Sequence, residues 1–191
     1  MKWFPDYRYI LASGSPRRQQ MLRDLSLPFE VWTADTPEVY PPGIRVVDIP
    51  IFLARQKAIP FKPVLGDKDL LITADTIVCM GNQVLGKPGD REHAREMLKV
   101  LSGKIHQVIT GMCLTSSKKE VVFSDVTLVE FKVLSEDEIE YYVDAYQPYD
   151  KAGAYGIQEW IGLTGVVRID GSFFNVVGMP VQRLYEEILR F

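Results

Sequence analysis

The sequence has few of the residues that disulfide frameworks and soft-metal sites need. Its 191 residues include only two cysteines, Cys79 and Cys113, and two histidines, His93 and His106. Neither pair has the spacing of a zinc site, and both cysteines lie in apolar runs, which favours buried, reduced thiols in a reducing cytosol. We therefore expect a cytoplasmic protein in which any bound metal is held by oxygen ligands.

Long apolar runs and an excess of one charge are also missing. No segment reaches the length of a membrane-spanning helix, and the N-terminal residues MKWFPDYRYI lack the apolar region of a signal peptide. The net charge is -3, and basic and aromatic residues do not interleave in the way that single-stranded nucleic acids require. We expect neither a membrane nor a nucleic acid as partner.

Two common nucleotide-binding motifs are missing as well. The chain has neither the GxxxxGKS/T phosphate loop nor the GxGxxG fingerprint, and no nucleophile-elbow motif supports a Ser-His-Asp triad. No linker, repeat or low-complexity segment divides the chain. With 47% hydrophobic residues, the sequence predicts one domain over residues 1–191 with a sizeable core.

Strand-like and helix-like segments are mixed along the chain. Residues 69–80 form an apolar run typical of a buried central strand, and residues 90–103 have the cap and apolar stripe of a helix. Residues 104–116 and 120–133 resemble two long, antiparallel strands, and residues 46–61 resemble a helix. Because strands and helices do not alternate strictly, we predict an α/β fold with a mixed, elongated, twisted sheet and flanking helices.

The segment LASGSPRRQQML, residues 11–22, contains an unusual helix start. Ser15 suits the N-cap, yet Arg17 and Arg18 follow at a position where the helix dipole disfavours positive charge. Small residues from Ser13 to Ser15 and the backbone N–H groups of a helix start form an anion site, to which two guanidinium groups add phosphate donors. The alternative is a solvated basic turn whose arginines pair with nearby acids.

Other polar residues stand where packing alone would not place them. Asp75 interrupts the apolar run at 69–80, next to Thr76, and a buried carboxylate needs a cation, a metal or a donor. With Glu38 it is the best candidate for a Mg²⁺ or Mn²⁺ ligand. A structural aspartate paired with arginine, and an exposed loop glutamate, remain the alternatives.

Two lysines and one loop complete the candidates. Lys57 and Lys87, each taken alone, fit a solvated surface. The loop YDKAGAYGIQ is rich in small residues, so a ligand could approach its backbone, and the amide of Gln158 could read the edge of a base.

Taken together, these segments resemble the Maf family of nucleoside triphosphate pyrophosphatases. The matching stretches run in family order from near residue 9 to near residue 185: LASGSPRRQQML, ADTIV, GKPGDREHAREMLKVLSGKIHQVITG, DKAGAYGIQ and IDGSFFNVVGMP. The resemblance implies metal-assisted hydrolysis of a nucleoside triphosphate to a monophosphate and pyrophosphate. The implied fold has two lobes around a central cleft, similar to the inosine triphosphate pyrophosphatases, and a homodimer is compatible with it.

The resemblance also implies roles for individual residues. Asp75 resembles the catalytic carboxylate and a metal ligand, together with Glu38. The phosphate-binding residues would be Ser13, Ser15, Arg18, Lys57 and Lys87. The residues Arg17, Thr76 and Gln158 are those of the branch that acts on dTTP and UTP. One amide can pair with the carbonyl–NH–carbonyl edge of uracil or thymine, whereas guanine offers two donors that suit a carboxylate.

Other functions of the same fold remain open at this point. The chain could act on 7-methyl-GTP or inosine-type triphosphates, or bind nucleotides as a regulator with little turnover. The family resemblance implies a house-cleaning role against noncanonical or modified nucleotides. The older family label, septum formation inhibitor, suggests a link to cell division.

Overall fold

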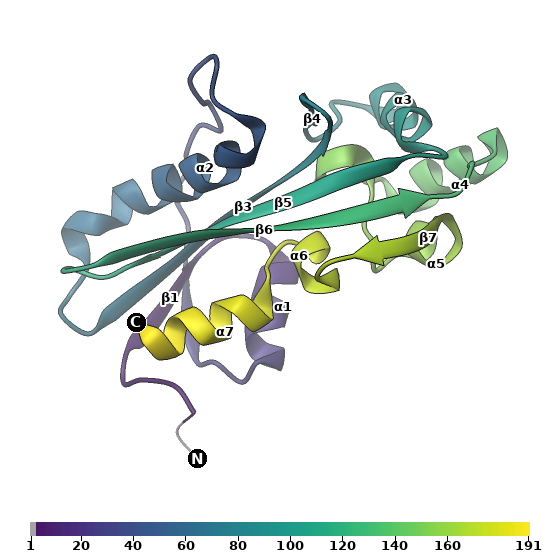
Figure 1. The fold of residues 1–191 in the computed structure, drawn as a ribbon. Coiled ribbons are helices and arrows are strands. Elements are labelled where there is room, and N and C mark those ends of the chain that lie inside the picture. The colour runs from purple at the N-terminus through teal and green to yellow at the C-terminus, as the bar shows by residue number, and fades with distance from the viewer. Residues whose placement is uncertain (1–2) are drawn as a thin grey trace. The chain divides into compact units, whose positions relative to one another are not determined.

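The computed structural model describes residues 3–191 and contains one mixed β-sheet with flanking helices (Figure 1). The strands are β1 (Arg8–Ala12), β2 (Phe29–Trp32), β3 (Asp69–Met80), β4 (Gln83–Leu85), β5 (Ile105–Thr115), β6 (Glu120–Phe131) and β7 (Val166–Asp170). The α-helices are α1 (Pro16–Asp24), α2 (Ile49–Ala58), α3 (Arg91–Leu101), α4 (Glu136–Tyr146), α5 (Trp160–Gly165), α6 (Phe173–Val177) and α7 (Val181–Arg190). Short 3-10 helices are η1 (Val46–Asp48), η2 (Ile59–Val64) and η3 (Ala152–Ala154).

Parallel and antiparallel pairings occur in the same sheet, whose strand order is β2-β1-β3-β5-β6-β7 with β4 paired to β3. Strand β1 runs parallel to β2 and β3, whereas β4 is antiparallel to β3 and β7 is antiparallel to β6. The neighbours β5 and β6 are joined by a tight turn, closed by a bond from Ser116 N–H to the Lys119 carbonyl. This confirms the predicted α/β class with a mixed sheet.

The chain forms two compact units. Unit 1 comprises Met1–Asp75, Thr110–Asp125 and Gly178–Phe191, and unit 2 comprises Thr76–Ile109 and Val126–Val177. Each of the long strands β3, β5 and β6 therefore contributes residues to both units. A single domain over residues 1–191 stays a prediction.

In unit 1, helix α2 packs closely on the sheet (Figure 1). A side chain at Gly111 of β5 would place its Cβ 2.3 Å from the backbone of Pro50 and Ile51, so only glycine allows this approach. The hydroxyl of Thr73 in β3 donates a 2.7 Å hydrogen bond to the Ala54 carbonyl of the same helix. These contacts hold α2 in a defined position along β3.

In unit 2, helices α3 and α4 both begin at side-chain caps, and the start of α3 at Asp90 is the predicted one. Asp90 caps α3 by accepting from the His93 N–H at 2.8 Å, and Ser135 and Glu138 form a reciprocal capping box on α4. The predicted apolar stripe of α3 is buried, and its residues are Ala94, Met97, Leu98 and Leu101. The local signals therefore determined both helices.

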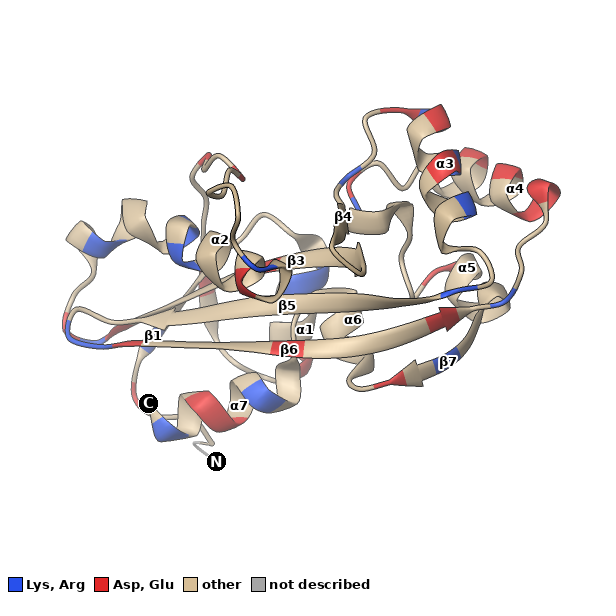
Figure 2. Cartoon of the chain, turned by 45° about the horizontal axis from the view of Figure 1, so that its top comes forward, with Lys and Arg blue, Asp and Glu red and all other residues tan. Residues whose placement is uncertain are grey.

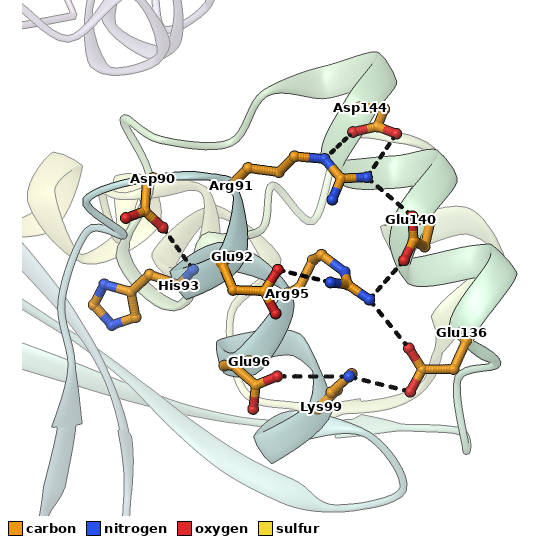
Figure 3. Close-up of polar contacts among 10 residues, drawn as sticks. All are labelled: Asp90, Arg91, Glu92, His93, Arg95, Glu96, Lys99, Glu136, Glu140 and Asp144. Carbon is orange, nitrogen blue, oxygen red and sulfur yellow. Dashed lines mark hydrogen bonds and ion pairs between the residues drawn. The ribbon is translucent and has the colours of Figure 1, made fainter.

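Charged residues are concentrated on α3 and α4 (Figure 2), and an ion-pair network joins the two helices (Figure 3). Arg91 contacts Asp144 at 2.6 Å and Glu140 at 2.9 Å, and Arg95 reaches Glu140 at 2.6 Å and Glu136 at 3.6 Å. The three acids follow one another every four residues on α4. Single exposed pairs contribute little, but a shared network fixes the relative orientation of two helices.

One predicted helix differs from the structure, and two short helices were not predicted. The helix predicted over 46–61 is divided into η1, α2 and η2. Pro50 is tolerated only in the first turn of α2, so the α-helix does not extend back to residue 46, and Pro60 and Pro63 interrupt regular hydrogen bonding after Ala58. Helices α5 and α6 were not predicted, since segments of 6 and 5 residues are too short to show a periodic pattern. No helix within residues 3–191 is long and apolar enough to cross a membrane.

Candidate active site

The start of α1 is built as predicted, with Ser15 at the N-cap and Pro16 in the first turn. The Ser15 hydroxyl accepts from the Arg18 N–H at 3.5 Å, and the Ser13 hydroxyl accepts from the Ser15 N–H at 3.2 Å. Each hydroxyl thus shapes the backbone of the turn and keeps its own proton to donate. Arg17 lies in the same helical turn, half-buried.

Arg18 does not belong to a solvated basic turn. Its Nε donates to the Gly178 carbonyl at 2.9 Å, and its Nη1 donates to the Ala74 carbonyl at 2.8 Å. Burial lowers the pKa of the guanidinium, while the nearby Asp75 and Glu38 carboxylates oppose this shift. The positive charge is therefore held in a fixed orientation beside Asp75.

One lysine joins the two candidate carboxylates. Lys57 Nζ lies 2.6 Å from Asp75 Oδ1 and 3.0 Å from Glu38 Oε1. Thr73 and Asp75 share one face of β3, and they meet Ala54 and Lys57, which lie three residues apart on α2. The packing of α2 on the sheet thus brings Lys57 to Asp75.

Burial disfavours the ionised form of Asp75, whose surface is only 6% exposed. Burial raises the pKa of its carboxyl group above the ordinary value, with a further increase from Glu38, although Lys57 and Arg18 oppose the shift. A carboxylate of raised pKa is a better proton acceptor than an exposed one. The direct side-chain partner of Asp75 is Lys57, which also contacts Glu38, and Arg18 adds a second positive charge nearby.

The donor set suits a hard divalent cation that takes part of its ligands from a substrate. Two carboxylates, Glu38 and Asp75, meet at one positive charge. Within residues 3–191, no group of three or more His, Cys, Asp or Glu side chains is placed to hold a metal. Mg²⁺ is commonly bound by one or two carboxylates together with substrate phosphates and water, so these residues fit that ion.

Thr76, Lys87 and Gln158 belong to unit 2. The Gly153 N–H donates to the Gly86 carbonyl at 3.0 Å, which brings the turn containing Lys87 against the loop that ends at Gln158. Both Lys87 and Gln158 are exposed, whereas Thr76 is half-buried. Within this unit the structure thus places a cationic and an amide side chain on adjoining segments.

Sequence reasoning missed several groups around the candidate residues. The carbonyls of Ala74 and Gly178, which orient Arg18, carry no side-chain signal. Tyr142 and Glu159, which contact each other at the turn that carries Gln158, carry no recognisable sequence signal. Ala74 lies in the stretch ADTIV and Gly178 in IDGSFFNVVGMP, and these two family-like stretches are their only signal in the sequence.

Comparison with known proteins gives a consistent result over the length of the chain. Residues 8–191 match the family model described as "Maf-like protein". A protein of Bacteroides fragilis named "dTTP/UTP pyrophosphatase" is 52% identical over 183 residues, which cover 95% of each chain. Relatives with the same name occur in Parabacteroides distasonis, 52% identical over 97% of this chain and 96% of that one, and in Flavobacterium johnsoniae, 48% identical over 94% and 93%.

Solved structures resemble this fold more distantly. The Ham1 protein of Staphylococcus aureus has a TM-score of 0.44 and 13% identity, covering 65% of this chain and 71% of that one. A nucleoside-triphosphatase, or dITP/XTP pyrophosphatase, of Mycobacterium abscessus has a TM-score of 0.40 and 15% identity, covering 65% and 74%.

Proposed function

The chain belongs to the Maf family, and we propose that it hydrolyses dTTP and UTP to the nucleoside monophosphate and pyrophosphate. Relatives about half identical over nearly the whole chain carry the name dTTP/UTP pyrophosphatase. The observation that carries the proposal is the buried Asp75 carboxylate, bridged by Lys57 to Glu38 and flanked by the oriented Arg18. Such a cluster combines a base with fixed positive charges for a polyanionic substrate.

Asp75 is the proposed general base. Its carboxylate, with a raised pKa, accepts a proton from the water that attacks phosphorus. The new bond forms between the water oxygen and phosphorus, and the phosphoanhydride bond to pyrophosphate breaks. Lys57 and Arg18 bind and orient the phosphates, so that most of the rate enhancement comes from positioning and charge stabilisation.

The divalent metal that the family resemblance implies would be held by Glu38 and Asp75. When bound, Mg²⁺ or Mn²⁺ would offset the negative charge of the phosphates and of the leaving pyrophosphate. Ser13, Ser15 and Lys87 would supply further donors to the phosphates, as the resemblance implies.

Gln158 is the proposed reader of the base, together with Arg17 and Thr76. Its amide has both a donor and an acceptor, as the edge of uracil or thymine requires. Cytosine replaces one carbonyl of that edge with an amino group, so it presents a different pattern. We therefore expect a preference for UTP and dTTP over CTP and the purine nucleotides.

A panel of triphosphates tests this proposal. Pyrophosphate release would be measured from UTP, dTTP, CTP, GTP, ITP and 7-methyl-GTP, with Mg²⁺, with Mn²⁺ and with a chelator. We expect metal-dependent release that is fastest for UTP and dTTP, and none from the Asp75→Asn variant. Release mainly from 7-methyl-GTP or ITP would contradict the substrate assignment, and tight binding without release would favour a nucleotide-binding regulator.

Replacing Gln158 with Glu tests the base-reading role separately. A carboxylate has no donor for the uracil carbonyl, so kcat/KM for UTP should fall about tenfold or more, since the site would contain an unpaired polar group. The Gln182→Glu variant, an exposed glutamine on α7, is the matched control. Unchanged substrate preference in Gln158→Glu would contradict the role of this amide.

A further inference from the structure

The four residues from Gly156 to Glu159 form a tight turn that presents Gln158. The Glu159 N–H donates to the Gly156 carbonyl at 3.0 Å, and Gly156 and Ile157 are buried while Gln158 is exposed. A Cβ on Gly156 would lie 2.9 Å from Gln158 Nε2 and 2.7 Å from Glu159 Cδ. The Gln158 amide therefore folds back over Gly156, beside the carboxylate of Glu159.

A single hydroxyl connects the two ends of this turn. The buried Tyr142 Oη accepts from the Gly156 N–H at 2.9 Å and donates to Glu159 Oε2. The other oxygen of Glu159 pairs with Lys151 Nζ at 3.1 Å, and the side chains of this pair are only 18% and 10% exposed. The turn is thus held through backbone and side chain at once.

The surroundings of this hydroxyl are rigid. The ring of Tyr142 is fully buried on the inner face of α4, whose outer face carries the ion pairs to α3 (Figure 3). Upstream in the loop, Tyr155 is anchored by a 2.8 Å hydrogen bond between its hydroxyl and His106 Nε2. Directly before Tyr155, Ala154 adopts a left-handed φ of 59°, a conformation that persists only where the surrounding structure enforces it.

We infer that Tyr142 is a positioning residue for base recognition: its hydroxyl fixes the turn Gly156–Glu159 and so orients the Gln158 amide toward the pyrimidine edge. This inference rests on the proposed function of Gln158. It follows from geometry, because the amide cannot keep a defined direction if the turn that carries it is free to move. In this role Tyr142 acts through the turn and Gln158, because its hydroxyl is bonded to Gly156 and Glu159.

The test compares base selectivity in Tyr142→Phe and Gly156→Ala. Tyr142→Phe removes the hydroxyl and keeps the buried ring. Gly156→Ala displaces the side chains of Gln158 and Glu159 by steric contact. Loss of one oriented hydrogen bond should lower the UTP-to-CTP ratio of kcat/KM about 3- to 10-fold, through a higher KM for UTP with kcat nearly unchanged. Tyr146→Phe, on the same helix and stacked on Tyr142 at 5.0 Å between ring centroids, is the control.

A double-mutant cycle separates positioning from general support of the fold. In a Gln158→Ala background, Tyr142→Phe should cause no further loss of selectivity. An unchanged ratio in both Tyr142→Phe and Gly156→Ala would overturn the inference, as would an equal loss in the Gln158→Ala background.

Calorimetric binding of a non-hydrolysable UTP analogue, measured beside turnover, distinguishes the role of Tyr142 from the proposed hydrolytic function. Tight analogue binding that weakens in Tyr142→Phe supports the inference even if the protein releases no pyrophosphate, and absence of analogue binding to the parent overturns it.

Discussion

Lys57 Nζ lies 2.6 Å from Asp75 Oδ1, although the two residues belong to different elements and are separated by 18 positions. The lysine also contacts Glu38 at 3.0 Å, so one ammonium group balances two carboxylates. Its side chain is 20% exposed, which leaves it accessible to a phosphate. The protonation state of Asp75 therefore depends on Lys57, and this dependence can be measured through the pH dependence of the rate.

Replacing Lys57 with Met should shift the acid limb of the pH–rate profile. Lys57 lowers the pKa of Asp75, which burial holds above its ordinary value, so its removal raises that pKa further. Because the base must be ionised, kcat should fall at a higher pH than in the parent, and kcat/KM at pH 7 should drop about 10²-fold or more. Steady-state rates from pH 4 to 9 provide the test, with the exposed Lys62 on η2 as control in Lys62→Met. An acid limb at the parental position would contradict the coupling.

The Asp75→Asn variant should be inactive and yet more stable than the parent at pH 7. A carboxyl whose folded pKa is raised opposes folding when ionised, so stability is lost as pH rises through that pKa and is regained when the charge is removed. We therefore expect a higher melting temperature than that of the parent in thermal melts at pH 7.

A matched variant on the same strand should behave in the opposite way. Two hydrogen bonds from Arg8, at 2.8 and 2.7 Å, lower the pKa of the Asp69 carboxyl group. Its ionised form therefore favours folding, and Asp69→Asn should lower the melting temperature at pH 7. Equal shifts in both variants would show that burial of Asp75 does not oppose folding.

Arg18→Lys should reduce kcat/KM for UTP about 10- to 100-fold with a smaller effect on folding. A lysine has one compact charge and cannot reach the Ala74 and Gly178 carbonyls in the fork geometry of a guanidinium. The control is Arg23→Lys, at an exposed position in the last turn of the same helix. Steady-state kinetics and thermal melting of both variants distinguish the roles, and full activity in Arg18→Lys would remove Arg18 from the site.

His106 should make the fold sensitive to acid. Burial lowers the pKa of its imidazole from the ordinary value of 6.5 to about 4. Between these values the unfolded chain binds a proton that the folded chain does not, so the free energy of unfolding decreases as pH falls. From pH 6.5 to pH 5 this amounts to about 1.5 kcal/mol, or about 3–6 °C in melting temperature.

His106→Gln should abolish this part of the pH dependence, because glutamine does not titrate and can still pair with Tyr155. Thermal melts of the parent and the variant at pH 6.5 and 5 test the prediction. The exposed His93, as His93→Gln, is the control. A variant that loses as much stability as the parent between these pH values would assign the acid sensitivity to other groups.

Much of the secondary structure could be predicted from short segments. Ser15 and Asp90 start their helices as expected, and the run at 69–80 is the buried strand β3. These signals act over three or four residues, so the chain itself contains them. The shorter helices and the divided segment at 46–64 escaped prediction, because prolines and packing decide them.

The sequence by itself determined which residue types the candidate site contains. An aspartate in an apolar strand and arginines at a helix start break local rules, and such breaks mark functional sites. The tertiary structure alone decided that Lys57 bridges Asp75 and Glu38, that distant carbonyls orient Arg18, and that the Tyr142 hydroxyl holds the turn that carries Gln158. The physical reason is the range of the interactions: caps and strand alternation act between near neighbours, whereas burial and pairing of charges depend on how the elements pack.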